Sequence, residues 1–417
     1  MIKAPNHYDI AIIGDGIVGS SLACALDDVG FRVALVSADA WGCAEDCPDD
    51  LAGLRVSALS GSSCHLLQRV GIWPELASTG QLKPYRGVQV WDSCSTQDLT
   101  FQATELHRDE LGFIVADRCV TLALHRQLAQ RSSIICYTGV SLQDLSMFRL
   151  GCGRELNLDD GTRLTASLVV GADGAHSNSR FLAGFALQTW DHSYCMINAQ
   201  VQLAQSHQDT VWQCFTATGS LLLLPLPVTA GQNRCVLIWL VQPAQAVSLM
   251  ALDADDFCQA LGQVVACRLG SVLAVDSRLC APLRQQHVKS YVRPAMALLS
   301  DAAYIMHPLL AQGTNLGLLD VVALTEILGY AYRRGADFSS LPVLQRYQRR
   351  RQRDNLHLMA LTAVLSRLHG TQNIRSYCWR NLSLGTLRQL PSVKCALMQR
   401  VIDLGLALPP LTLPNSF

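Results

Sequence analysis

The chain has 417 residues, in which 33 Lys and Arg balance 33 Asp and Glu. This balance leaves no overall field to attract a polyanion, so we expect no nucleic-acid partner. Hydrophobic residues make up 50% of the chain and charged residues 16%, the reverse of a disordered composition, so we expect a folded protein.

The N-terminal segment has the pattern of a strand, a glycine turn, a helix and a second strand. Apolar runs over 8–13 and 31–36 predict buried strands, and residues 20–29 suit a helix. The turn contains three glycines in the spacing GxGxxG: Gly14, Gly16 and Gly19. In a dinucleotide-binding βαβ unit, the first makes the turn, the second lets a diphosphate approach the backbone, and the third permits close packing.

One expected residue is missing from this unit. An acidic residue that binds the adenosine ribose should end the second strand, but Ser37 stands there. A serine can still hydrogen-bond a ribose hydroxyl, though more weakly than a carboxylate. On this motif alone, a glycine turn in an unrelated α/β protein remains an alternative.

Two later segments repeat the pattern of a buried strand that leads into a turn, over 164–170 and over 296–299. The turn residues that follow are Asp173 and Gly174, then Asp301, and finally Gln312 and Gly313 ahead of a helix that begins near Asn315. Because the carboxyl ends of parallel strands meet at one sheet edge, we expect these turns to converge on one large ligand.

Between these segments, residues 75–110 and 185–285 alternate apolar and polar side chains, which favours an antiparallel sheet inserted into the nucleotide domain. The chain turns helical from Asn315 onward. We therefore expect three parts: a discontinuous nucleotide domain of 1–74, 111–184 and 286–345, a sheet domain of 75–110 and 185–285, and a helical region of 346–417.

Two other features of the sequence favour ordinary structure. Five arginines fall between Arg346 and Arg353, and Arg346, Arg350 and Arg353 recur at helical spacing. This pattern indicates a solvated helix face, with a contact to an acidic partner or to phospholipid head groups as the alternative. Trp91 and Trp212 are sheet-core candidates, or else they line a route for an apolar ligand.

No stretch approaches the roughly 20 apolar residues that cross a bilayer, and the N-terminus has no signal-peptide pattern. The 16 cysteines lack paired spacing, so we expect buried free thiols in the cytoplasm and no metal site.

In its order of motifs, the chain resembles the class A flavin-dependent aromatic hydroxylases, and more narrowly the ubiquinone-biosynthesis hydroxylases. The motifs are GxGxxG, the segment RVSAL from Arg55 to Leu59, GADGAHS over 171–177, and DAAYIMHPLLAQGTNLGLLD over 301–320. The likeness covers nearly the whole chain. It implies an α/β fold: a Rossmann-like FAD-binding domain with an inserted, mainly antiparallel β-sheet substrate domain and a helical C-terminal region.

The resemblance also implies roles for the motif residues. Gly14, Gly16 and Gly19 would hold the FAD diphosphate, Ser37 would lie at the ribose, and Asp301 would lie at the ribityl chain or the adjoining phosphate. The segment from Gln312 through Gly313 to Asn315 would border the flavin ring. Asp173 and Gly174 would serve both FAD and a nicotinamide donor, and Arg55 and Arg118 would lie beside the cofactor.

Four positions depart from the family pattern. Ser300 and Tyr304 replace the first glycine and the histidine of Gly-Asp-Ala-Ala-His, Ala311 replaces a glycine, and Thr121 replaces a glutamine. If Ala311 adopts a left-handed backbone, we expect a strain of about 1–2 kcal/mol, enough to weaken FAD binding about tenfold.

The implied activity is an FAD-dependent monooxygenase that hydroxylates a polyprenylated benzoquinol or phenol in ubiquinone biosynthesis, with O₂ and a reductant such as NAD(P)H. In this class a flavin C4a-hydroperoxide delivers the oxygen, so the protein mainly orients the ring and excludes water. No catalytic side chain is evident. His307 is a weak candidate for proton transfer, and a turn histidine is the simpler interpretation.

Two alternatives remain. The first is a degenerate, non-catalytic paralogue that acts as a structural subunit of a ubiquinone-biosynthesis complex. The second is a related hydroxylase for another aromatic metabolite. Peripheral contact with the inner membrane is a further expectation.

Overall fold

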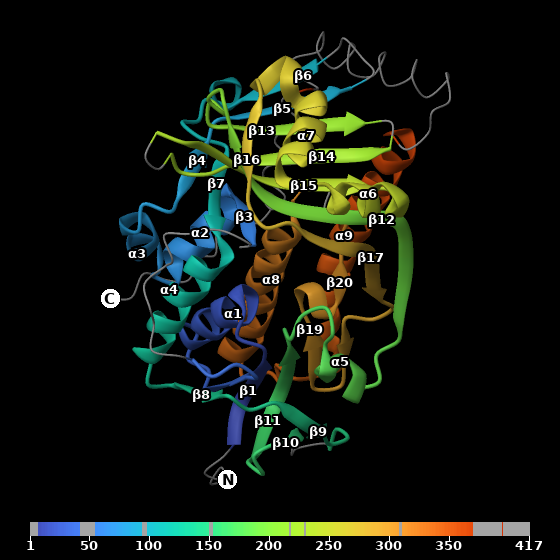
Figure 1. Ribbon diagram of the computed structural model, residues 1–417. Coiled ribbons are helices and arrows are strands. Elements are labelled where there is room, and N and C mark those ends of the chain that lie inside the picture. The colour runs from blue at the N-terminus through green and yellow to red at the C-terminus, as the bar shows by residue number, and fades with distance from the viewer. Residues whose placement is uncertain are drawn as a thin grey trace.

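The computed structural model describes residues 7–41, 55–93, 98–149, 153–216, 218–228, 231–307, 311–369 and Lys394. These residues form a parallel-centred sheet, a large mainly antiparallel sheet and a small sheet, with helices around them. In Figure 1 the large sheet lies at the top and the parallel-centred sheet at the bottom, with a long central helix between them.

The parallel-centred sheet has the strand order β18-β19-β11-β1-β2-β8, with β10 and β9 following beside β11. Its strands are β1 (His7–Ile13), β2 (Val33–Ser37), β8 (Ile134–Thr138), β9 (Leu142–Leu145), β10 (Arg154–Leu158), β11 (Arg163–Gly171), β18 (Val292–Arg293) and β19 (Met296–Leu298). β1 pairs in parallel with β2 and β11, and β11 pairs in parallel with β19. The predicted strands and their parallel arrangement are therefore confirmed.

The register of this sheet brings distant turns together. Ile13 pairs with Gly171, and Gly171 pairs with Leu298. The chain therefore leaves β1, β11 and β19 at the same edge of the sheet. This is the edge at which open parallel sheets bind ligands.

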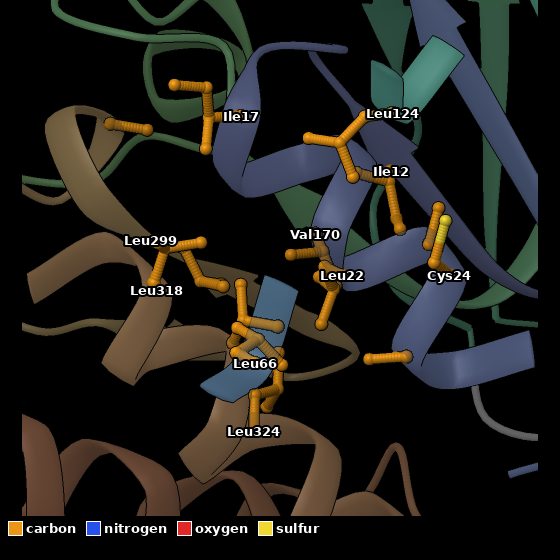
Figure 2. Close-up of a cluster of buried hydrophobic side chains, with 14 of the residues drawn as sticks. Ile12, Ile17, Leu22, Cys24, Leu66, Leu124, Val170, Leu299, Leu318 and Leu324 are labelled. Carbon is orange, nitrogen blue, oxygen red and sulfur yellow. The ribbon is translucent and has the colours of Figure 1, made fainter. Parts of the chain in front are cut away.

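Helices α1 (Ile17–Asp27), α2 (Gly61–Arg69), α4 (Asp117–Ala129) and α8 (Gly313–Arg333) pack around this sheet. Figure 2 shows side chains of these helices gathered with residues of β1 and β11, and the labelled ones are Ile12, Ile17, Leu22, Cys24, Leu66, Leu124, Val170, Leu299, Leu318 and Leu324. The small sheet pairs β7 (Gly112–Ala116) with β3 (Val56–Ser60) and β4 (Lys83–Tyr85), and α3 (Trp73–Ser78) lies nearby in sequence.

The large sheet runs β20-β17-β12-β15-β14-β13-β5-β6, with β16 beside β12. Its strands are β5 (Gly87–Asp92), β6 (Asp98–Gln102), β12 (Leu187–Leu203), β13 (Thr210–Thr216), β14 (Gly219–Pro225), β15 (Asn233–Val241), β16 (Val272–Val275), β17 (Leu279–Val288) and β20 (Tyr304–Ile305). All described pairs are antiparallel except β13 with β5. This confirms the inserted, mainly antiparallel sheet.

One face of the large sheet packs against α6 (Pro243–Ala251) and α7 (Ala254–Leu269). Ile197, Ala199 and Val201 of β12 belong to that core. Because side chains alternate along a strand, the residues between them point to the opposite face, which looks toward the parallel-centred sheet. Trp91 and Trp212 lie in the helix-covered core with ring centroids 6.1 Å apart, so they are core residues.

The last described helix, α9 (Leu341–His369), packs against α8, and the expectation of a solvated arginine face holds for Arg346 and Arg353 but is wrong for Arg351. Arg346 and Arg353 are exposed, but Arg351 is only 3% exposed and pairs with Asp320 of α8. Arg351 lies on the face of α9 that packs against α8, whereas Arg346 and Arg353 are exposed to solvent.

Most of the free cysteines that the structure describes are buried, as expected. Burial raises the pKa of the Cys24 and Cys64 thiols to about 12, which makes them unreactive. Cys119 of α4 is an exception, because it is disulfide-bonded. The part of the chain that the structure describes contains no helix long and apolar enough to span a membrane.

Candidate active site

A cavity of about 560 Å³ lies where the parallel-sheet edge meets the inner face of the large sheet. This volume is ordinary for a small-molecule site. Ten of the residues singled out in the sequence line it: Gly16, Arg55, Thr121, Gly174, Ser300, Asp301, His307, Ala311, Gln312 and Gly313. The predicted convergence of distant turns on one ligand-sized space is thus present in the fold.

The three glycines of the first turn have different structural roles. A Cβ on Gly14 would lie 2.4 Å from the Ala172 carbonyl oxygen, and one on Gly19 would lie 1.9 Å from the Gly14 carbonyl oxygen. These two glycines therefore allow the turn after β1 to pack against its own helix and against the turn after β11. Gly16 has no atom within 4 Å of its Cβ position and lines the cavity, so it leaves room for a ligand.

Two helices begin at the cavity without a side-chain cap. The N-cap residues are Gly16 for α1 and Gln312 for α8, and in neither helix does an N-cap side chain accept a hydrogen bond from a backbone N–H of the first turn. By contrast, Ser60 caps α2 and Asp253 caps α7. The free N–H groups and the positive dipole ends of α1 and α8 therefore both favour negative charge at this cavity.

The turn after β19 carries a buried carboxyl group. Asp301 lies in the 3-10 turn η2 (Ser300–Ala302). Burial raises the pKa of Asp301, Arg55 acts to lower it, and Asp117 adds to the increase. Burial disfavours the charged form of this carboxyl group, and such a group in a cavity is typical of a binding site.

A buried ion pair holds this turn in place. The Ser300 backbone N–H donates to Asp320 Oδ2 at 3.0 Å, and the Tyr304 hydroxyl donates to the same oxygen at 2.6 Å. Arg351 Nε lies 2.6 Å from Asp320 Oδ1. Tyr304, which stands where the family has histidine, is therefore part of the support of the turn.

The two positions at which family glycines are replaced both have left-handed backbones. The φ angle is 51° at Ser300 and 48° at Ala311. Both residues line the cavity. The condition set for Ala311, a left-handed backbone, is thus met, and by the same argument we expect a strain of about 1–2 kcal/mol at Ser300. The weaker FAD binding expected from this strain stays a prediction.

Asn315 ties the start of α8 to the small sheet and α2. It is 1% exposed and its amide oxygen accepts from the Ser60 N–H and the Ser63 hydroxyl, while its nitrogen donates to Ala58 O and Gln312 Oε1. Asn315 does not line the cavity, so the geometry gives it a positioning role. Its predicted contact with a flavin edge stays a prediction.

Sequence reasoning missed a polar cluster on the cavity wall. The Ser57 hydroxyl donates to Asp117 Oδ1 at 2.5 Å and lies 2.7 Å from the Thr314 hydroxyl. Burial raises the pKa of Asp117, and hydrogen bonding by Ser57 and the charge of Arg55 oppose the increase. Thr121 also lines the cavity and donates its hydroxyl to the Asp117 carbonyl. Ser57 and Thr314 stand in the quoted motifs and Thr121 was singled out as a departure, but no signal in the sequence marked Asp117.

Besides Gly14, Gly19 and Asn315, three more predicted residues lie outside the cavity lining. Asp173 accepts hydrogen bonds from the Ser177 and Ser179 hydroxyls, and so fixes the start of α5 (Asn178–Leu182). Arg118 is exposed on the first turn of α4. Ser37 is 1% exposed and donates its hydroxyl to the Asp39 carbonyl. Their cofactor contacts remain predictions.

A carboxylate does lie near Ser37, on the glycine turn. Asp15 Oδ2 accepts from Trp41 Nε1 at 2.6 Å and lies 3.1 Å from His125 Nε2. Burial acts to raise the pKa of Asp15, but hydrogen bonds from His125, Trp41 and Ser37 hold it below its ordinary value. The Trp41 and His125 rings are stacked with centroids 4.1 Å apart.

The large sheet supplies an apolar wall to the same cavity. Its apolar members are Met196, Val236, Ile238, Leu279 and Leu283, joined by Ile305 and Met306 after the Asp301 turn. Asn198 and Gln200 of β12 are the amides among them. The cavity therefore has one polar side, formed by turns and helix starts, and one apolar side that suits an aromatic ring.

Comparison with known proteins agrees with this geometry. A family model described as an FAD binding domain matches residues 7–360. The chain is 34% identical over 350 residues to the 3-demethoxyubiquinol 3-hydroxylase of Escherichia coli (strain K12), covering 83% of this chain and 86% of that protein. It is 31% identical over 439 residues to the mitochondrial ubiquinone biosynthesis monooxygenase COQ6 of Xenopus tropicalis, covering 94% and 93%.

Solved structures share the fold at lower identity. The chain matches p-nitrophenol 4-monooxygenase PnpA from Pseudomonas putida DLL-E4 with a TM-score of 0.75 and 16% identity, covering 95% of this chain and 98% of that one. It matches PqsL, a probable FAD-dependent monooxygenase from Pseudomonas aeruginosa, with a TM-score of 0.74 and 19% identity, covering 91% and 100%. These likenesses establish the architecture.

Proposed function

The chain belongs to the family of FAD-dependent monooxygenases that share this FAD binding domain, and from that premise we propose that it hydroxylates the ring of a polyprenylated benzoquinol or phenol in ubiquinone biosynthesis. The observation that carries the proposal is a cavity with one wall of turns and helix starts and another of apolar sheet residues. Relatives named for ubiquinone biosynthesis support the substrate class.

The residues at the cavity fit FAD. Cβ positions on Gly16, Gly174 and Gly313 have no atom within 4 Å, so the backbone leaves space where a cofactor would approach. The free start of α1 would hold the diphosphate, and that of α8 would face the flavin ring and stabilise negative charge on it. Asp301 would accept hydrogen bonds from the ribityl chain. When bound and reduced, FAD supplies the oxygen-activating chemistry.

The protein would then contribute orientation and shielding. The apolar residues of β12, β15 and β17 would hold an aromatic ring against the cofactor side of the cavity and exclude water. His307 is 7% exposed and lines the cavity, so it remains the weak candidate for moving a proton. An apolar prenyl tail would leave along the same wall.

Several finer features belong to the proposal. NAD(P)H would reduce the flavin, and the protein would work in the cytoplasm at the periphery of the inner membrane, where a prenylated substrate resides. A complex with other ubiquinone-biosynthesis proteins would fit the same setting. Residues 75–110 and 185–285 would form the substrate domain, and 1–74, 111–184 and 286–345 the FAD domain.

The test is turnover by the FAD-loaded protein. Purified protein would be incubated with 2-geranylphenol, O₂ and NADPH, and the product analysed by mass spectrometry for one added oxygen. Hydroxylated product supports the proposal. Flavin oxidation that releases hydrogen peroxide without product favours a hydroxylase for another metabolite, and a folded protein that takes up no FAD favours the structural-subunit alternative. Unchanged ubiquinone precursors in cells that lack the protein would contradict the pathway.

A further inference from the structure

Two amide side chains on the apolar wall have no visible structural purpose. Asn198 and Gln200 of β12 both line the cavity. The amide oxygens of both are buried, and neither has a hydrogen-bond partner. Gln200 is 4% exposed as a whole. Two unpaired amide oxygens therefore lie where the large sheet lines a ligand-sized cavity.

An unpaired buried amide destabilises the fold, because the group loses its hydrogen bonds to water and gains none in return. Nothing in the packing requires an amide here, since the neighbouring cavity residues of β12 and β15 are Met196, Val236 and Ile238. A ligand in the cavity would supply the missing partners. The terminal amide torsion is soft, so rotation can bring either the oxygen or the NH₂ group to that ligand.

The spacing of the two amides narrows the kind of ligand. Residues two apart on a strand point to the same face and lie roughly 7 Å apart. Two amides at this separation can reach two substituents of one aromatic ring at the same time. Their carbonyl oxygens accept hydrogen bonds from hydroxyl groups, and their NH₂ groups donate to ether or carbonyl oxygens.

We propose that Asn198 and Gln200 are the ring-recognition residues of the substrate site, and that they select an aromatic ring that carries a free hydroxyl group. This inference rests on the proposed function and specifies what the apolar wall recognises. The apolar neighbours give affinity for the ring and its tail, whereas the two amides select among rings by the oxygen substituents that they carry. A ring without a hydroxyl group leaves the amide oxygens unpaired and is rejected.

The test uses the FAD-loaded protein and a matched pair of ligands, 2-geranylphenol and its methyl ether. Dissociation constants are measured by isothermal titration calorimetry for wild type, Gln200→Met and Asn198→Leu. Gln202→Met is the control, because Gln202 lies on the same strand outside the cavity lining. Wild type and the control should bind the phenol at least about tenfold more tightly than the ether. In Gln200→Met this ratio should fall toward one, and Asn198→Leu should reduce it.

Stability gives a second readout. Thermal unfolding of ligand-free Gln200→Met should occur at or above the wild-type temperature, because the substitution removes an unpaired polar group. A lower unfolding temperature would assign the amide a structural role and overturn the inference. An unchanged phenol-to-ether ratio in both variants would also overturn it, while hydroxylation by wild type would leave the proposed function standing. Wild type that takes up neither FAD nor 2-geranylphenol would overturn both.

Discussion

Arg351 Nε on α9 lies 2.6 Å from Asp320 Oδ1 on α8, and both side chains are buried. The other oxygen of Asp320 accepts the Ser300 backbone N–H, so this ion pair supports the turn that carries Asp301. Breaking a buried ion pair destabilises the folded state strongly, because the remaining charge is then buried without a partner. Helix α9 thus supports the cavity through Asp320 and the Ser300–Ala302 turn, although no described residue of α9 lines the cavity.

Arg351→Met should lower the free energy of unfolding by about 3–5 kcal/mol, because it leaves the Asp320 carboxylate buried without a counter-charge. Arg350→Met is the matched control on the same helix. Arg350 lies 2.6 Å from Glu326, but its side chain is 30% exposed, so its loss should cost about 0–1 kcal/mol. Urea unfolding of the two variants measures the difference. Equal losses would show that α9 does not bury the charge as described.

Tyr304→Phe should cost about 1.5–3 kcal/mol, because it removes a hydrogen bond to the Asp320 carboxylate. Tyr347→Phe removes an equally buried hydroxyl, which donates to the neutral Leu298 carbonyl at 2.9 Å, and should cost about 0.5–1.5 kcal/mol. The comparison is made by urea unfolding of the two variants. If Tyr347→Phe is the more damaging change, Tyr304 does not support the Asp301 turn through a charged hydrogen bond.

Ser300→Gly and Ala311→Gly should each raise FAD affinity, because glycine adopts the left-handed backbone of these positions without strain. Relief of about 1–2 kcal/mol corresponds to an increase in affinity of about 5- to 30-fold. Ala302→Gly is the control, since Ala302 is buried in the same turn and does not have a positive φ angle. Fluorescence titration of apo protein with FAD measures the affinity. No gain in either glycine variant would mean that the two backbones are not strained in solution.

Asp301 should make the stability of the apo protein pH-dependent. Its pKa is raised in the fold, chiefly by burial, so the folded state binds a proton that the unfolded state has already released. The free energy of unfolding should therefore fall as pH rises from the ordinary value near 3.8 through the raised pKa. Asp301→Asn removes this titration, so the variant should gain stability relative to wild type over that window. Urea unfolding from pH 4 to pH 7 tests it, and a constant difference would contradict the raised pKa.

Much of the fold could be predicted from the sequence, because its signals are local. Apolar runs that end in glycine or aspartate gave β1, β11 and β19, and the topology of parallel sheets predicted that their turns converge. The burial of Arg351 could not be predicted, because it depends on which face of α9 packs against α8. Similarly, alternation along β12 separates its two faces but does not say which face looks into a cavity.

Residues of the site could be predicted only where they belong to a recognisable motif. Gly16, Gly174 and Asp301 stand in motifs with a known spacing, and all three line the cavity. Asp117 belongs to no motif that marks it, and it meets Ser57, which also contacts Thr314, only because α4, α8 and β3 converge. Such clusters are set by tertiary packing, which a single sequence does not reveal.

The central claim is that the open glycine turn at the cavity holds FAD, and its most direct test is the amount of FAD bound per chain in wild type and in Gly16→Val. No atom lies within 4 Å of the Gly16 Cβ position, so the variant should fold with an unchanged unfolding temperature in the absence of FAD. Wild type should carry close to one FAD per chain by absorbance after reconstitution, and Gly16→Val should retain little. A folded wild type that remains colourless in excess FAD, or a Gly16→Val variant that retains as much FAD as wild type, would contradict the account.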